Sequence, residues 1–127
     1  MSYYNNKAII ITGDGTRLKE AHSKAKQIFK YDEDGNKINM VSNIIGTGMN
    51  QFMHFFICPC GSKAEWSYET FFDEKYKEMI NYLKSFNDED AYNSMPLEDY
   101  FKIGSISWIL VKYGDKGTSI LDTNCEK

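Results

Sequence analysis

The 127-residue sequence contains few histidines, few cysteines and no long apolar run. A membrane span needs about 20 consecutive apolar residues, so none is predicted. The amino terminus, residues 1–7, lacks the apolar core of a secretory signal, and we therefore expect a cytoplasmic protein. The three cysteines are an odd number, which does not indicate a secreted disulfide framework.

Recognisable motifs for catalysis, metals and cofactors are also lacking. Cys58 and Cys60 could join His54 and Cys125 around zinc, but a Cys-x-Cys pair leaves little room for two thiolates and no second close pair exists. The run 32–36 starts like a calcium loop, yet the glutamate expected at the twelfth position is missing. We therefore predict a protein with no metal, no cofactor and no enzymatic activity.

A basic excess is absent as well, and the charge is unevenly distributed. The net charge is −3, which argues against a general nucleic-acid binder. Residues 1–64 carry eight basic and five acidic residues, whereas residues 65–127 carry seven and thirteen. Within the second half, residues 65–101 hold ten acidic residues, three lysines and ten of the nineteen aromatic residues. This composition predicts a surface that binds a basic partner.

The hydrophobic pattern predicts one α+β domain spanning residues 1–127. Strands are expected at 8–12, 38–45, 51–57, 64–69, 106–113 and 118–122, with one helix beginning at Thr16 as N-cap and a second at Asp73. Their order is β-α-β-β-β-α-β-β, which predicts a mainly antiparallel sheet of about five strands with two helices on one face. Residues 87–104 are predicted to form a long acidic surface loop.

Periodicity also predicts which side chains are buried. The first helix has a basic outer face that includes Arg17, and the strand at 51–57 is apolar at nearly every position, so both of its faces are expected to be covered. The predicted core comprises Leu18, Ala21, Ala25, Ile28 and Phe29, then Tyr76, Met79, Ile80, Leu83 and Phe86, together with Phe52, Phe56 and Trp108.

A glycine-containing turn precedes the first helix and offers a weak anion site at Gly13, Gly15, Thr16 and Arg17. The amide groups at a helix N-terminus can hold a phosphate. The glycine spacing fits neither the P-loop nor the dinucleotide-binding pattern, and Asp14 would repel an anion. A plain tight turn is the favoured interpretation, and a nucleotide site is the alternative.

Several short motifs are spread along most of the chain. They are Phe55-Phe56-Ile57, a turn ending Gly61-Ser62-Lys63, Trp66, Trp108 and Tyr113-Gly114-Asp115. In this combination the chain resembles small uncharacterised proteins encoded by bacteriophages and prophages. Such acidic phage proteins are similar, as a group, to inhibitors of host defence such as anti-CRISPR proteins and to sponges for immune nucleotides. The resemblance implies a setting of this kind.

These observations lead to a functional hypothesis, a non-enzymatic inhibitor of a host defence protein. The inhibitor would bind a basic, nucleic-acid-binding surface of that protein, without binding nucleic acid or membrane itself, as a monomer or a homodimer. Alternatives are a nucleotide sponge, a structural phage protein and, with least support, a metal-dependent phosphodiesterase. The predicted partner-binding residues are Trp66, Tyr68, Tyr82, Asp88, Glu89, Asp90, Tyr92, Glu98, Asp99 and Tyr100.

Overall fold

The chain folds into an antiparallel sheet with helices packed against it, in a computed structural model that describes residues 5–48, 51–61, 67–87, 105–115 and 117–125. Within these residues there are five strands and two α-helices, which confirms the predicted α+β fold. The elements are β1 (Asn5–Gly13), α1 (Gly15–Ile28), β2 (Ile45–Gly46), β3 (Met53–Ile57), α2 (Ser67–Lys84), the 3₁₀-helix η1 (Ser85–Asn87), β4 (Ile106–Gly114) and β5 (Ser119–Thr123).

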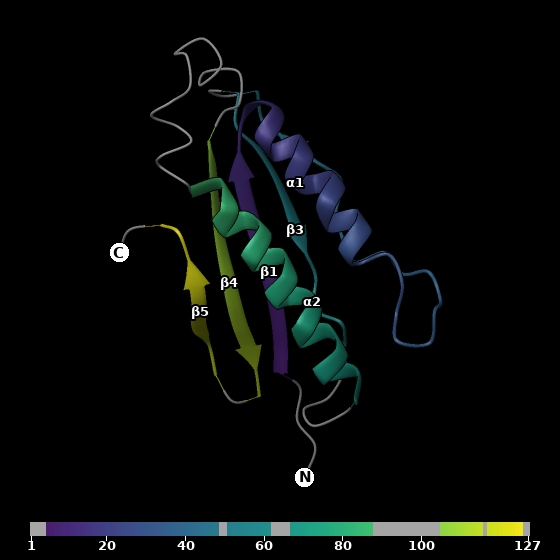
Figure 1. The fold of residues 1–127 in the computed structure, drawn as a ribbon. Coiled ribbons are helices and arrows are strands. Elements are labelled where there is room, and N and C mark those ends of the chain that lie inside the picture. The colour runs from purple at the N-terminus through teal and green to yellow at the C-terminus, as the bar shows by residue number, and fades with distance from the viewer. Residues whose placement is uncertain (1–4, 49–50, 62–66, 88–104, 116, 126–127) are drawn as a thin grey trace.

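Strand β1 lies at the centre of the sheet, whose order is β2-β3-β1-β4-β5 (Figure 1). It pairs over its full length with β4, from Asn5 opposite Gly114 to Gly13 opposite Ile106, and its second half pairs with β3. All of these pairings are antiparallel. Strands β4 and β5 form the predicted hairpin, in which the Gly117 amide donates to the Gly114 carbonyl at 3.1 Å.

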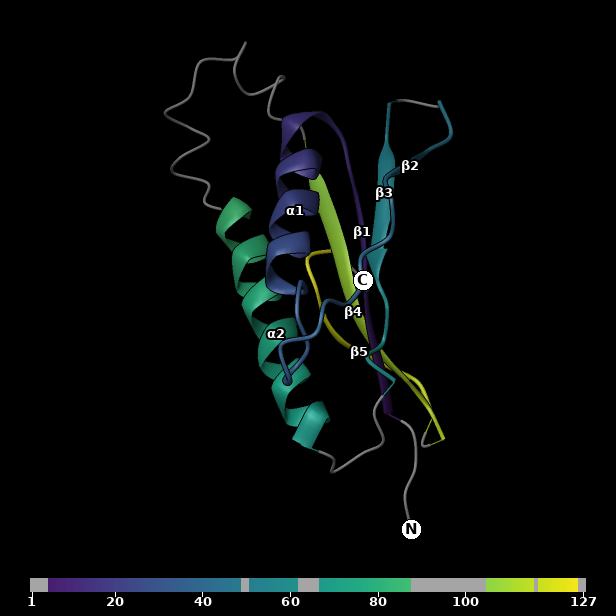
Figure 2. The same cartoon turned by 90° about the vertical axis from the view of Figure 1, so that its right-hand side faces the viewer.

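Both helices cover the same face of the sheet, as predicted (Figure 2). Ile9 and Ile11 of β1 are fully buried on that face, because alternate side chains of a strand point to opposite sides. No helix in the described part of the chain is long and apolar enough to cross a membrane. The predicted residues confirmed in the core are Leu18, Ala21, Ala25, Ile28, Phe29, Tyr76, Met79, Ile80, Leu83 and Trp108, with Phe86 partly buried against them.

The segment that precedes β3 forms much less strand than the predicted range 38–45, and Ser42 provides the reason. Its amide donates to the Phe56 carbonyl of β3 at 2.9 Å, but its carbonyl accepts a hydrogen bond of 2.9 Å from His22 Nε2 in α1. The Phe56 amide donates to the Ser42 hydroxyl instead, also at 2.9 Å. Because the carbonyl is turned toward the helix, the assigned strand is limited to the two residues of β2.

Helix α2 begins at Ser67, well before the predicted start at Asp73. The predicted strand at 64–69 is therefore wrong for its described residues, and the order of elements is β-α-β-β-α-β-β. The earlier start places Phe72 one turn before Tyr76, and both side chains are buried against the sheet. Tertiary packing of this apolar stripe outweighs the strand propensity of the aromatic residues.

Candidate functional site

The turn between β1 and α1 packs against the residue that precedes β4. Asp14, rather than the predicted Thr16, holds the N-cap position of α1. The Asp14 amide donates to the Ser105 carbonyl at 3.1 Å, and its carboxylate accepts from the Ser105 amide at 2.6 Å and hydroxyl at 3.3 Å. A Cβ on Gly13 would lie 2.4 Å from the Ser105 carbonyl oxygen, so this close approach requires glycine.

The same contacts bear on the weak anion site predicted at Gly13, Gly15, Thr16 and Arg17. Gly15 has a φ of 65°, in the left-handed region that favours glycine, so packing and backbone conformation account for both glycines. The Asp14 carboxylate places the protein's own negative charge at the positive end of α1, which disfavours a bound anion. Arg17 was predicted on the exposed face of α1 but is buried, with 9% of its surface exposed.

Arg17 connects α1 to the end of α2. Its Nη1 atom donates to the Phe86 carbonyl at 3.0 Å, and the guanidinium carbon lies 4.6 Å from the centre of the Phe86 ring. The Tyr82 ring packs edge-on against Phe86 at 5.0 Å between centroids, and the Lys24 ammonium lies 5.7 Å from the Tyr82 centroid. Burial raises the pKa of Tyr82. The cluster fixes the point at which the chain leaves α2.

Most of the predicted partner-binding residues lie outside the described part of the chain. Tyr68 falls in the first turn of α2, and Tyr82 is half-buried in the Arg17 cluster rather than freely exposed. The residues outside the described ranges are Trp66, Asp88, Glu89, Asp90, Tyr92, Glu98, Asp99 and Tyr100.

Two acidic residues of α2 have basic partners in the structure. Asp73 forms an ion pair with Lys7 of β1, and Glu74 lies 3.7 Å from the ammonium of Lys77 on the next turn. These pairs offset part of the negative charge of α2. The acidic excess of residues 65–101 consequently rests largely on the run beyond the helix.

The histidines and the Cys58 region make contacts that hold the fold together. His22 donates to the Ser42 carbonyl, and His54 Nδ1 shares a hydrogen bond of 2.9 Å with the Thr12 hydroxyl. The Tyr76 hydroxyl donates to the Cys58 carbonyl at 3.1 Å, and burial raises the pKa of the Cys58 thiol. Among the described residues, no group of three or more His, Cys, Asp or Glu side chains is placed to hold a metal ion.

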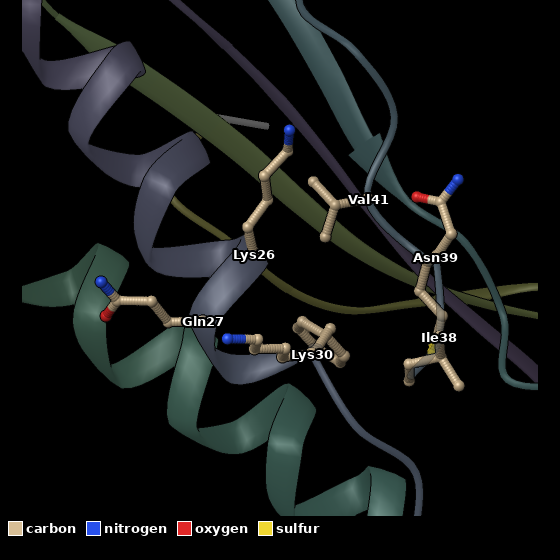
Figure 3. Close-up of a pocket in the computed structure, with 8 residues that line it drawn as sticks. Lys26, Gln27, Lys30, Ile38, Asn39 and Val41 are labelled. Carbon is tan, nitrogen blue, oxygen red and sulfur yellow. The ribbon is translucent and has the colours of Figure 1, made fainter. Parts of the chain in front are cut away.

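A pocket of about 410 Å³ lies beside the last turn of α1 (Figure 3). Lys26 and Lys30 stand on its helix side, and Ile38, Asn39 and Val41 form the facing wall (Figure 3). Lysines near a helix C-terminus are stabilised by the negative end of the helix dipole. This electrostatic role explains the two lysines without a ligand.

The face of the sheet that points away from the helices carries an extensive apolar surface, which we call the open face. Ile10, Phe56 and Ile120 are 49%, 45% and 62% exposed on it. Strand alternation and register assign to the open face Asn6, Ala8, Ile10 and Thr12 of β1, Ile45 of β2, His54 and Phe56 of β3, Ser107, Ile109, Val111 and Tyr113 of β4, and Ile120 and Thr123 of β5.

The open face corrects the prediction that both sides of the strand at 51–57 are covered. Phe56 and Phe52, predicted in the core, are 45% and 39% exposed. The reason is that α1 and α2 both lie on the opposite side of the sheet, so side chains pointing the other way receive no cover (Figure 2). The run Ile9-Ile10-Ile11 places apolar residues on both sides of β1, a pattern that fits a covered second side as well as an open one.

The open face is hollowed at its centre and carries no formal charge on its residues. A depression of about 370 Å³ is lined by Ile10, Ile45, Phe56 and Val111, among others, with Pro59 also contributing. None of the thirteen residues assigned to the open face is Lys, Arg, Asp or Glu. Such a surface can bind apolar groups.

We find no protein-family model, curated protein or solved structure that matches the chain. The resemblance to phage and prophage proteins remains a prediction from the sequence.

Proposed function

We propose that this chain is a non-enzymatic binding protein and that the open face docks another protein chain. The observation that supports the proposal is the set of exposed apolar side chains spread over the five strands, which are Ile45, Phe56, Ile10, Tyr113 and Ile120. Soluble proteins rarely leave a contiguous apolar surface exposed unless it serves as a contact site. Aromatic residues such as Phe56 and Tyr113 are also the types enriched at protein interfaces.

The extent of the open face favours a protein chain over a small ligand. Sites for small molecules usually combine apolar walls with a few polar groups that fix the ligand's orientation. Here the Thr12 hydroxyl and His54 Nδ1 share a hydrogen bond, so these two polar atoms are already engaged within the protein. The apolar surface also extends to Ile120, on the edge strand β5, beyond the residues that line the central depression. A second folded surface can cover that whole width.

Photo-crosslinking tests this proposal. Phe56 is replaced with benzoylphenylalanine, an aromatic residue of related shape, and the matched control carries the same probe at Ser23, which is exposed on α1. After irradiation in concentrated purified form and in a bacterial lysate, the position 56 probe is expected to form covalent adducts with a protein chain. The Ser23 probe is expected to form few. Absence of adducts from position 56 in both settings contradicts the proposal.

The predicted inhibitor of a host defence protein is a second candidate function, in the bacterial cytoplasm. The structure supplies one observation in its favour: Glu33, Glu74 and Glu78 line a hollow of about 710 Å³ on the side of α2. Phe71 and Lys75 also line it, with the Lys75 ammonium 5.3 Å from the centre of the Phe71 ring, so acidic side chains outnumber basic ones there. Carboxylates around an aromatic side chain suit a basic protein segment. This hollow lies on the helix side, so a basic partner there leaves the open face accessible.

Salt dependence and charge reversal test this second function. Capture of a host protein from lysate is expected to weaken as the salt concentration rises, because exposed charges are screened. Reversing Asp88, Glu89 and Asp90 to lysine is expected to abolish the capture, whereas reversing Asp115 in the β4–β5 turn is expected to leave it intact. Equal capture by both variants contradicts the inhibitor hypothesis.

A further inference from the structure

We propose that the chain covering the open face is a second copy of this protein, so that two sheets pack face to face in a symmetric dimer. The inference rests on the proposed function, because it names the partner of the same surface. In the dimer the helices of both copies lie on the outside, and the four layers follow the order helix, sheet, sheet, helix.

The charge of the open face suits pairing with itself. In a two-fold symmetric contact each patch meets its own copy, so any charged group near the axis faces a like charge. The open face avoids this repulsion because its residues are uncharged. Lys7 of β1 and Lys112 of β4 lie opposite each other, and Lys7 pairs with Asp73 of α2, so both lysines lie on the helix side of the sheet. A partner selected by charge would instead require charged groups on this surface.

The polar groups of the open face are few and partly satisfied already. Thr12 and His54 share a hydrogen bond within one copy, so burial does not leave those two atoms without a partner. Asn6 and Ser107 are each the second residue of antiparallel strands and so lie near opposite ends of the sheet, where water can reach the rim of an interface. The centre of the face is therefore apolar and its margin is polar, which is the usual anatomy of a stable interface.

Three side chains would form the centre of the contact. Ile10 lies directly opposite Phe56 of β3 and directly opposite Ile109 of β4 in the register, so the three form a row across the middle of the sheet. Packed sheets lie about 10 Å apart with their strands rotated by about 30°, and the side chains of the two inner faces interdigitate. The row on one copy crosses the row on the other at the symmetry axis.

The size of the sheet is sufficient for such a dimer. Strands β1 and β4 have nine residues each, and the sheet has five strands. Because β2, β3 and β5 are shorter, the five strands together have 30 residues, and at about 3.4 Å per residue and about 4.8 Å per strand spacing the face covers roughly 490 Å². Two copies in contact would bury roughly 1,000 Å² in total, which matches the lower size limit of about 1,000 Å² for a specific interface.

Sedimentation equilibrium measures the inference directly. The wild-type protein is expected to sediment at about twice the 14.7 kDa of one chain at micromolar concentration and above. Ile10→Glu places a charge at the centre of the contact and is expected to weaken self-association at least about thirtyfold, the factor for loss of an interface hot spot. Ser23→Glu adds the same charge to the outer surface of α1 and is expected to remain dimeric.

Mixing two variants of opposite charge distinguishes a lost contact from misfolding. Ile10→Glu and Ile10→Lys are each expected to be folded monomers by circular dichroism, and mixing them is expected to restore a two-chain species with one copy of each. A folded wild-type protein that stays monomeric at about 100 µM overturns the inference, as does a dimeric Ile10→Glu variant. If the monomer still forms adducts from position 56, the proposed function stands without the dimer; if it forms none, both fail.

Discussion

Replacing Arg17 with alanine is expected to lower the free energy of unfolding by about 3 kcal/mol. The guanidinium donates to the Phe86 carbonyl, and a hydrogen bond that involves a charged group contributes about 1.5–3 kcal/mol. Its position over the Phe86 ring adds about 0.5–2 kcal/mol. The two contributions share the same pair of residues and are not additive, so a value near the middle of their combined range is expected.

Urea denaturation followed by circular dichroism measures this loss, with the protein concentration held constant because association would affect stability. Arg17→Lys keeps the positive charge but loses the planar group that stacks on Phe86, so a loss of about 1–2 kcal/mol is expected. The double variant with Phe86→Leu is expected to be less destabilised than the sum of the single variants.

Phosphate distinguishes this structural role from the predicted anion site. If Arg17 bound phosphate, adding phosphate would stabilise the wild-type protein more than Arg17→Ala, because a ligand stabilises only the state that binds it. We expect phosphate to shift both proteins equally. A loss below about 0.5 kcal/mol for Arg17→Ala, or a phosphate effect confined to the wild type, would refute the structural interpretation.

Three further perturbations test individual contacts. Gly13→Ala is expected to lower the free energy of unfolding by about 1–3 kcal/mol, because the new Cβ would collide with the backbone of Ser105. Gly46→Ala, whose Cβ would have its nearest contact with a side-chain atom at 3.6 Å, is expected to lower it by less than about 1 kcal/mol. Urea denaturation compares the two variants. His22→Leu removes the donor to the Ser42 carbonyl and is expected to cost about 1–3 kcal/mol in the same assay. Burial and the neighbouring Cys60 raise the pKa of Tyr76 in the folded state above its value of about 10 in the unfolded chain. The unfolded chain therefore loses this proton first, and the free energy of unfolding falls as the pH rises above about 10. Tyr76→Phe is expected to reduce this fall.

Each of these expectations has a contrary result. Equal losses for the two glycine variants would mean that the approach to Ser105 relaxes without cost. A neutral His22→Leu variant would mean that the Ser42 carbonyl finds another donor. An identical alkaline fall in wild type and Tyr76→Phe would assign the pH dependence to other groups, such as Cys58 and Tyr82, whose pKa values burial also raises.

The helices were predictable because the spacing of apolar residues at every third or fourth position determines which side of a helix is buried. Leu18, Ala21 and Ala25 recur at spacings of three and four, and only one face of a helix carries such a stripe. Arg17 is an exception to this pattern, because its long side chain is buried while the guanidinium contacts the carbonyl and the aromatic ring of Phe86. No local pattern indicates that partner, because Phe86 lies 69 residues away in the chain.

The open face was hidden by an ambiguity in apolar strands. A run such as Phe55-Phe56-Ile57 fits a strand covered on both sides, and it fits equally a strand with one side left for a partner. The two cases differ only in where the helices pack, which depends on contacts between distant elements. The start of α2 at Ser67 was missed for a similar reason, because burial of Phe72 decided it.

The Ser42 carbonyl that turns toward His22 has a consequence for how copies of this chain can associate. A regular edge strand presents alternating N–H and C=O groups to any strand that approaches, which invites lateral growth into fibres. Beside β3 the edge strand is only two residues long, and the chain before it is held by a side-chain hydroxyl and a helix. This border is a poor template for another strand, so it disfavours open-ended polymerisation on that side.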